Sequence, residues 1–182
     1  MNQRIAVAVT AAAVGVGMTF VGVGTASAAT APLASCKASG TSTTTPGLTF
    51  TSAAHTTKLS GKLANCTGSG GVKSGTFSGS LKGTGSCTSL ASKGSVVGKG
   101  TVTLKWNTSK TSTVAATLTS QGGGISGSNV TAKFALSGKV TKGQFAGKKL
   151  SGTFNGHFPA KPGLCQTVPV SKIAFAGTSK IS

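Results

Sequence analysis

Apolar and polar side chains alternate most clearly between Asn129 and Val140. Val130, Ala132, Phe134, Leu136, Gly138 and Val140 fall on one face, and Asn129, Thr131, Lys133, Ser137 and Lys139 fall on the other. A period of two is typical of a strand with one buried face. Thr141-Lys142-Gly143 is a turn signal, and the chain then returns through Phe158. We therefore predict a β-hairpin over residues 129–158, with a bulge near Lys148 and Lys149 because Phe145 and Leu150 differ in phase.

The same alternation recurs in six other segments, and no window shows sustained helical spacing. Their inward residues are predicted to be Leu48 and Phe50; Leu59, Gly61 and Leu63; Gly75, Phe77, Gly79 and Leu81; Val102, Leu104 and Trp106; Val114, Ala116 and Leu118; and Ile173 and Phe175. With an even number of strands the first and last are antiparallel, so the sheet can close on itself. We predict an all-β fold, an antiparallel up-and-down barrel of about eight strands. A β-sandwich is the alternative.

Part of the predicted hairpin has an echo earlier in the chain. Residues 59–81 align without gaps onto residues 136–158, and ten of the 23 positions are identical. This indicates an internal duplication inside a single β domain, residues 47–182. The same interpretation assigns residues 29–46 to an N-terminal lead-in and Gln121–Gly124 to a loop.

The first 28 residues have the features of a secretory signal peptide. Arg4 precedes an apolar stretch, Ile5–Val23, and Ala26-Ser27-Ala28 is a small-residue cleavage site. An uncleaved membrane anchor is the alternative. Leu33-Ala34-Ser35-Cys36 also resembles a lipobox, so a lipid anchor at Cys36 is a minor alternative to a fully secreted protein.

Four cysteines in an exported chain predict two disulfides. If the strands run up and down, Cys36 and Cys66 fall at one end of the barrel, and Cys87 and Cys165 fall at the other. We therefore predict the pairs Cys36–Cys66 and Cys87–Cys165. None of these cysteines belongs to a Cys-x-x-Cys pair, so we predict no metal site and no cofactor.

The chain has no Asp and no Glu, and its Lys and Arg total 18, with Arg4 the one arginine. Side chains therefore cannot form salt bridges with one another. Paired-carboxylate and Ser-His-Asp catalysis are excluded. The two histidines, His55 and His157, stand apart and are predicted to lie on the surface. We predict that the protein is not an enzyme.

Two sets of residues are candidates for binding. Exposed lysines attract anionic polymers, such as a wall polymer or extracellular nucleic acid; the candidates are Lys133, Lys139, Lys142, Lys148 and Lys149. Alternation of Gly and Phe on the inward face could instead leave an apolar cavity; the candidates are Trp106, Phe134, Phe154 and Phe77. A carrier of a small apolar ligand would need a void of about 300 Å³ or more. A third class is an interaction protein, such as an inhibitor or a toxin component.

The chain also resembles the uncharacterised, Gly/Ser/Thr-rich secreted proteins of high-GC Gram-positive bacteria. The resemblance rests on the signal peptide, Cys36, Thr45-Pro46-Gly47-Leu48-Thr49, Cys66-Thr67, Ser86-Cys87-Thr88 and residues 100–106. It covers most of the mature chain and implies no enzymatic activity.

Overall fold

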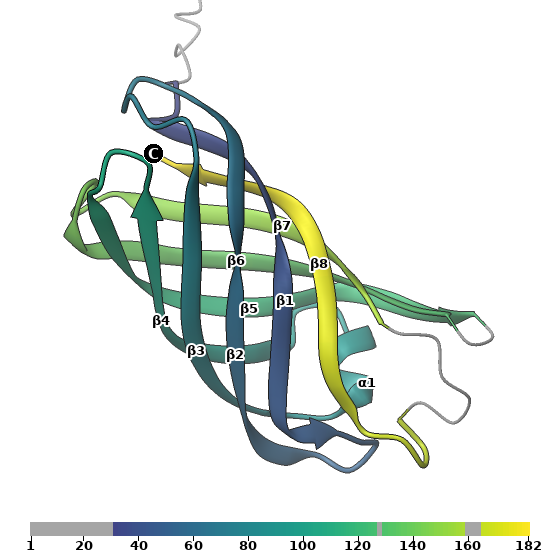
Figure 1. Ribbon diagram of the computed structural model, residues 1–182. Helices are drawn as coiled ribbons and strands as arrows, with labels where there is room; N and C mark the ends of the chain where they lie inside the picture. Colours follow the sequence, from purple (N-terminus) through teal and green to yellow (C-terminus); the bar gives the residue numbers. More distant parts are fainter. Residues whose placement is uncertain (1–30, 127–128, 159–164) are drawn as a thin grey trace, which may run out of the picture.

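Eight strands form one closed antiparallel barrel, in which each strand pairs with its neighbours along the chain and β8 pairs back onto β1 (Figure 1). This computed structural model describes residues 31–126, 129–158 and 165–182, so the predicted signal peptide lies outside it. The elements are β1 (Ala34–Leu48), β2 (Ala53–Thr67), β3 (Gly75–Gly85), α1 (Cys87–Ala91), β4 (Val96–Trp106), β5 (Thr111–Ser126), β6 (Asn129–Gly143), β7 (Lys149–His157) and β8 (Val170–Ile181). The predicted barrel is confirmed, and the alternative sandwich is wrong.

The two ends of the barrel differ. One end holds Trp106, the connections at residues 68–74, 107–110 and 144–148, and the C-terminus; we call it the tryptophan end. The other end carries α1 between β3 and β4, and we call it the helix end (Figure 1). At the helix end β5 and β6 extend away from the barrel as a two-stranded ribbon.

Both predicted disulfides are present, one at each end. Cys36–Cys66 joins β1 to β2 at the tryptophan end, and Cys87–Cys165 joins α1 to the segment before β8 at the helix end. No described cysteine is free. Disulfides of this kind persist in oxidising compartments.

Pairs of Phe and Gly on facing strands fill much of the interior. Phe77 lies opposite Gly61, and Phe175 lies opposite Gly40. A Cβ added at Gly61 would lie 2.4 Å from Cζ of Phe77, so the ring occupies the space that a side chain would need. The inward Gly–Phe alternation therefore packs aromatic rings against bare backbone, as the sequence predicts.

The first strand was predicted too late. β1 begins at Ala34, so most of the predicted lead-in (residues 29–46) is strand, and Phe50, predicted to point inward, is 47% exposed in the connection to β2. The inward residues of β1 are small or polar, and their alternation is therefore hard to recognise; they include Ala34, Cys36, Ala38, Ser42 and Thr44.

Three local predictions also differ from the structure. Gly122–Gly124 belong to β5, where they pair with residues 131–133 of β6, instead of forming a loop. Residues 144–148 form the connection between β6 and β7, so Phe145, with a φ of 67°, lies in a turn and not beside a bulge. His55 is buried, because it has the same inward parity as Leu59 in β2.

The internal echo is only partly reproduced in the structure. Its two copies fall on β2–β3 and on β6–β7, and both connections lie at the tryptophan end. The pairing register differs, however. Gly61 faces Phe77 in the first copy, whereas the equivalent Gly138 faces Leu150 and not Phe154 in the second. The two copies therefore have the same strand arrangement and the same inward positions, but their equivalent residues pair with different cross-strand partners.

Candidate functional site

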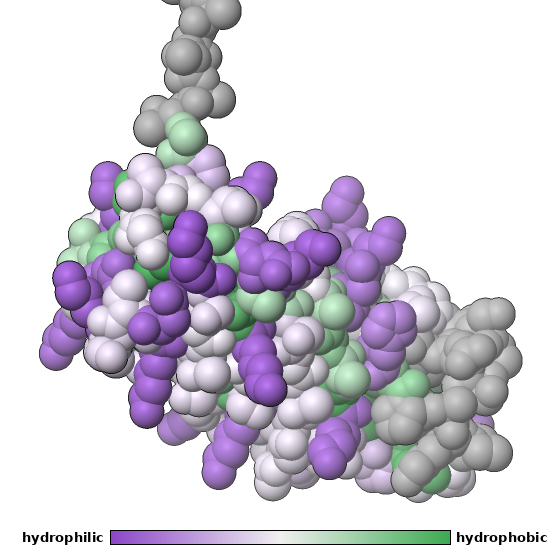
Figure 2. All heavy atoms as spheres, turned by 45° about the horizontal axis from the view of Figure 1, so that its top comes forward, coloured by the Kyte–Doolittle hydropathy of each residue, from purple (hydrophilic) through white to green (hydrophobic). Residues whose placement is uncertain are grey.

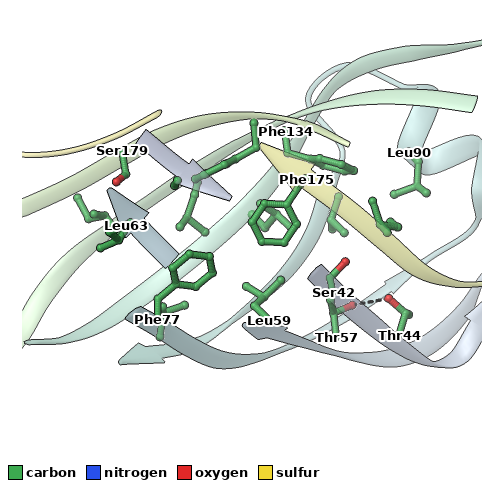
Figure 3. Close-up of a pocket in the computed structure, with 18 of the residues that line it drawn as sticks. Ser42, Thr44, Thr57, Leu59, Leu63, Phe77, Leu90, Phe134, Phe175 and Ser179 are labelled. Carbon is green, nitrogen blue, oxygen red and sulfur yellow. Dashed lines mark hydrogen bonds between the residues drawn. The ribbon is translucent and has the colours of Figure 1, made fainter. Parts of the chain in front are cut away.

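A narrow apolar cavity runs through the interior of the barrel, with a volume of about 70 Å³. Phe77, Phe134 and Phe154 line it as predicted, together with Phe175, and Figure 3 shows the rings of Phe77 and Phe175 beside the lumen. Trp106 is not part of the lining. The volume is well below the 300 Å³ or so at which pockets for drug-sized ligands begin.

Few polar groups face this cavity. The hydroxyls of Thr44 and Thr57 hydrogen-bond to each other at 3.0 Å, and Ser42 and Ser179 are the other polar residues in the lining (Figure 3). Every fully buried side-chain nitrogen or oxygen in the described residues has a partner. The cavity thus offers a ligand little space and little directional recognition.

Packed side chains cover both ends of the cavity. At the tryptophan end, the ring of Trp106 meets Phe145 edge-on at 5.6 Å, and its Nε1 donates to Ser112 Oγ at 2.9 Å. Ser112 Oγ in turn donates to the carbonyl of Gln144. At the helix end, Leu90 of α1 is buried against the core. Trp106 therefore closes the barrel instead of lining a ligand site.

The buried side chain of His55 contacts backbone carbonyl groups of the barrel. Its Nε2 lies 3.1 Å from the carbonyl oxygen of Val97, and its Nδ1 lies 3.4 Å from that of Ala53. His157, in contrast, is exposed as predicted. In the part of the chain that the structure describes, no three His, Cys, Asp or Glu residues come together as a metal site.

All lysines in the described residues are exposed, and they concentrate at one end of the barrel. Figure 2, which brings the tryptophan end forward, shows long hydrophilic side chains standing out from a pale surface of intermediate hydropathy. Lys37, Lys62, Lys73, Lys105, Lys110, Lys139, Lys142, Lys148, Lys149 and Lys180 lie near this end, whereas Lys58, Lys82, Lys93, Lys99, Lys133 and Lys172 lie towards the helix end. Since the sequence has no acidic side chain, no side chain on the barrel neutralises them.

The five lysines predicted from the sequence do not form one cluster. Lys139 and Lys149 are direct cross-strand partners on β6 and β7, and Lys142 and Lys148 lie close to them in sequence, near the connection. Lys133 is six residues before Lys139 on β6, which places it about 20 Å away along the strand. Four of the five predicted lysines therefore lie near one another, and Lys133 lies apart from them.

Five lysines on successive strands form a continuous row, which we call the lysine belt. Lys139 on β6 faces Lys149 on β7. Lys180 on β8 faces Ser151, two residues from Lys149. Lys37 on β1 lies two residues from Ser35, the partner of Lys180, and Lys62 on β2 faces Ser39, two residues from Lys37. The Cβ atoms of direct partners and diagonal neighbours in a sheet lie about 5–8 Å apart, so lysine side chains leave the sheet at that spacing across the five strands.

A shallow groove lies on the outer face beside the belt, with a volume of about 280 Å³. The backbones of Phe134, Phe154 and Gly177 pass beneath it, since Phe134 and Phe154 also line the interior cavity. The polar side chains of the outer groove are Gln121, Lys133, Thr153, Asn155 and Thr178.

No protein-family model matches the chain, and comparison with curated proteins and with solved structures finds no similar protein. No helix in the described residues is long and apolar enough to span a bilayer. Function therefore has to be inferred from this chain's own residues.

Proposed function

We propose that this is an exported, non-enzymatic protein that binds anionic polymers at the cell surface or in the surrounding medium. The lysine belt is the observation that carries the proposal. It places five exposed lysines on five successive strands, and the sequence contains no carboxylate side chain to compete for them.

Two further features support export and binding outside the cell. The disulfides require an oxidising environment, and the N-terminal 28 residues have the pattern of a signal peptide. The small interior cavity, about 70 Å³, is evidence against the carrier alternative. No feature of the connections that the structure describes specifically favours an inhibitor or toxin component.

Titration of the purified protein with a fluorescently labelled linear polyphosphate tests the proposal. If the five belt lysines each displace one counter-ion, log K should fall with log salt at a slope of about −3.5 to −4.5, and binding should be lost at about 0.2 M salt. An uncharged polymer of equal length, such as dextran, should not bind. The proposal is wrong if the polyphosphate and the neutral polymer bind equally at about 50 mM salt, or if neither binds.

A further inference from the structure

The lysine belt and the outer groove are parts of one surface. Lys37 of the belt is the direct partner of Thr178 in the groove, and Lys133 is the direct partner of Asn155 on the other side of it. The groove thus spans β5 to β8, with Lys133 lining it on β6 and Lys37 beside it on β1. Neighbouring strands are about 4.8 Å apart, so Lys37 and Lys133, three strands apart, stand roughly 15 Å from each other.

The groove offers groups that recognise hydroxyls. The side-chain amide of Asn155 has no hydrogen-bond partner among the described residues. Gln121 makes one long contact, from its Nε2 to Thr119 Oγ1 at 3.4 Å, and the hydroxyls of Thr153 and Thr178 are 3.5 Å apart. Amides and hydroxyls both donate and accept hydrogen bonds, which matches the hydroxyl groups of a polyol or a sugar.

The same surface is poorly suited to nucleic acid. Binding of single strands normally uses aromatic side chains on which bases stack. The large apolar side chains that are exposed in the described residues are Phe50 and Val96, and both lie at the helix end, away from the belt. Trp106 is only 5% exposed. Arg4, the one arginine of the sequence, falls in the predicted signal peptide, so the forked contacts of arginine are also missing from the barrel.

We propose that the belt and the groove together bind a polymer of polyol or sugar units linked by phosphodiesters. Its phosphates follow the belt across the strands, and one hydroxylated unit at a time occupies the groove. The groove volume of about 280 Å³ lies just below the range for drug-sized ligands and suits one such unit. This inference rests on the proposed function and names the chemical class of its polymer.

The test compares three labelled probes of equal charge: poly(glycerol phosphate), linear polyphosphate and a single-stranded oligothymidylate. A groove variant, Gln121→Ala with Asn155→Ala, changes no charge. We expect it to weaken poly(glycerol phosphate) binding about tenfold, since two hydrogen bonds are lost, and to leave polyphosphate binding unchanged. Circular dichroism and the emission of Trp106 confirm that each variant is folded.

Two charge variants distinguish the effect of the lysine belt on binding from the effect of net charge. Lys139→Gln with Lys149→Gln removes a directly facing lysine pair from the belt, and Lys82→Gln with Lys99→Gln removes a directly facing pair from β3 and β4, nearer the helix end. The belt variant should weaken the binding of all three probes severalfold more than its charge-matched control.

The outcomes distinguish this inference from the proposed function. If polyphosphate binds and the belt variant weakens it, but the groove variant affects no probe or affects all probes equally, the polymer class is wrong and the proposed function stands. Tighter binding of the oligothymidylate than of poly(glycerol phosphate) at matched salt would identify nucleic acid as the partner and overturn the inference. If no polyanion binds, both proposals fail.

Discussion

The two disulfides should stabilise the barrel by different and calculable amounts. Each closes a separate loop, of sequence separation 30 for Cys36–Cys66 and 78 for Cys87–Cys165. A disulfide lowers the conformational entropy of the unfolded chain, and the effect grows with the logarithm of loop length. The loop-closure relation gives about 3.6 kcal/mol for the shorter loop and about 4.5 kcal/mol for the longer one at 25 °C.

The two replacements can be compared directly because the cysteines have similar surroundings. All four are buried, with exposures of 2–6%. The paired changes Cys36→Ala with Cys66→Ala and Cys87→Ala with Cys165→Ala therefore leave similar small voids, and the remaining difference of about 0.9 kcal/mol reflects loop length. Removing both bridges should cost about 8 kcal/mol, which is comparable with the whole stability of a typical domain.

Urea unfolding followed by tryptophan emission measures these losses. Trp106 is the one tryptophan in the chain, and it is packed against Phe145 in the core, so its emission reports on the barrel. We expect the variant without Cys87–Cys165 to unfold at the lower urea concentration, and both variants to show larger m-values because their unfolded chains are less compact. Equal losses, or a larger loss from the shorter loop, would refute the entropic account and point to local contacts around each bridge.

Three single substitutions should lower the free energy of unfolding for different reasons, each measurable by urea titration followed by circular dichroism, because one of them removes the tryptophan. Gly61→Ala should cost about 2 kcal/mol, because the new Cβ would lie 2.2 Å from a backbone carbonyl oxygen and 2.4 Å from Phe77. Trp106→Phe should cost about 1–2 kcal/mol, since it removes the donor to Ser112 in the core. Ser86→Ala should cost about 1 kcal/mol by removing the capping box of α1, and should speed reduction of Cys87–Cys165 by dithiothreitol.

Matched controls exist for the first and third of these changes. A Cβ at Gly124 meets no atom within 4 Å, so Gly124→Ala should leave stability nearly unchanged. Thr84→Ala replaces an exposed residue of β3 that takes no part in the capping box, and it should not speed reduction. If either control behaves like its partner, backbone crowding at Gly61 or capping at Ser86 is not the cause.

The topology was predictable from sequence because most strands carry their own signal. Alternation identifies the inward face, short connections make sequential strands neighbours, and an even strand count allows closure. The cysteine pairing then followed, since strand direction alone places Cys87 and Cys165 at the same end. The first strand was placed too late because the period of two is visible only when the inward residues are large, and β1 uses residues such as Ala38 and Ser42.

Two other misses have different causes. His55 lies four residues before Leu59 and therefore on the same inward face of β2. Extending the predicted strand towards the N-terminus would have predicted its burial. α1 is only five residues long, too short for a helical period, and Ser86 with Ser89 was its available signal.

The candidate site was less predictable than the fold. Lys139 and Lys149 are near in sequence and could be grouped by inspection. Lys37 and Lys180 join them only because β8 pairs with β1 in one particular register. The alternation of inward and outward residues does not specify that register. The outer groove depends on register in the same way, since its lining residues come from four neighbouring strands, β5 to β8.

Lysines that face each other directly, Lys139 with Lys149 and Lys82 with Lys99, make the folded barrel a polyelectrolyte whose counter-ions must come from outside. Facing like charges destabilise a sheet, and salt screens them. Added salt should therefore raise the thermal midpoint while it weakens polymer binding, which is the reverse of a fold that depends on surface salt bridges. A bound polymer supplies fixed counter-charge, so it should stabilise the barrel by mass action at low salt. Part of the folding stability of this protein would then depend on the salt and the polyanions around it.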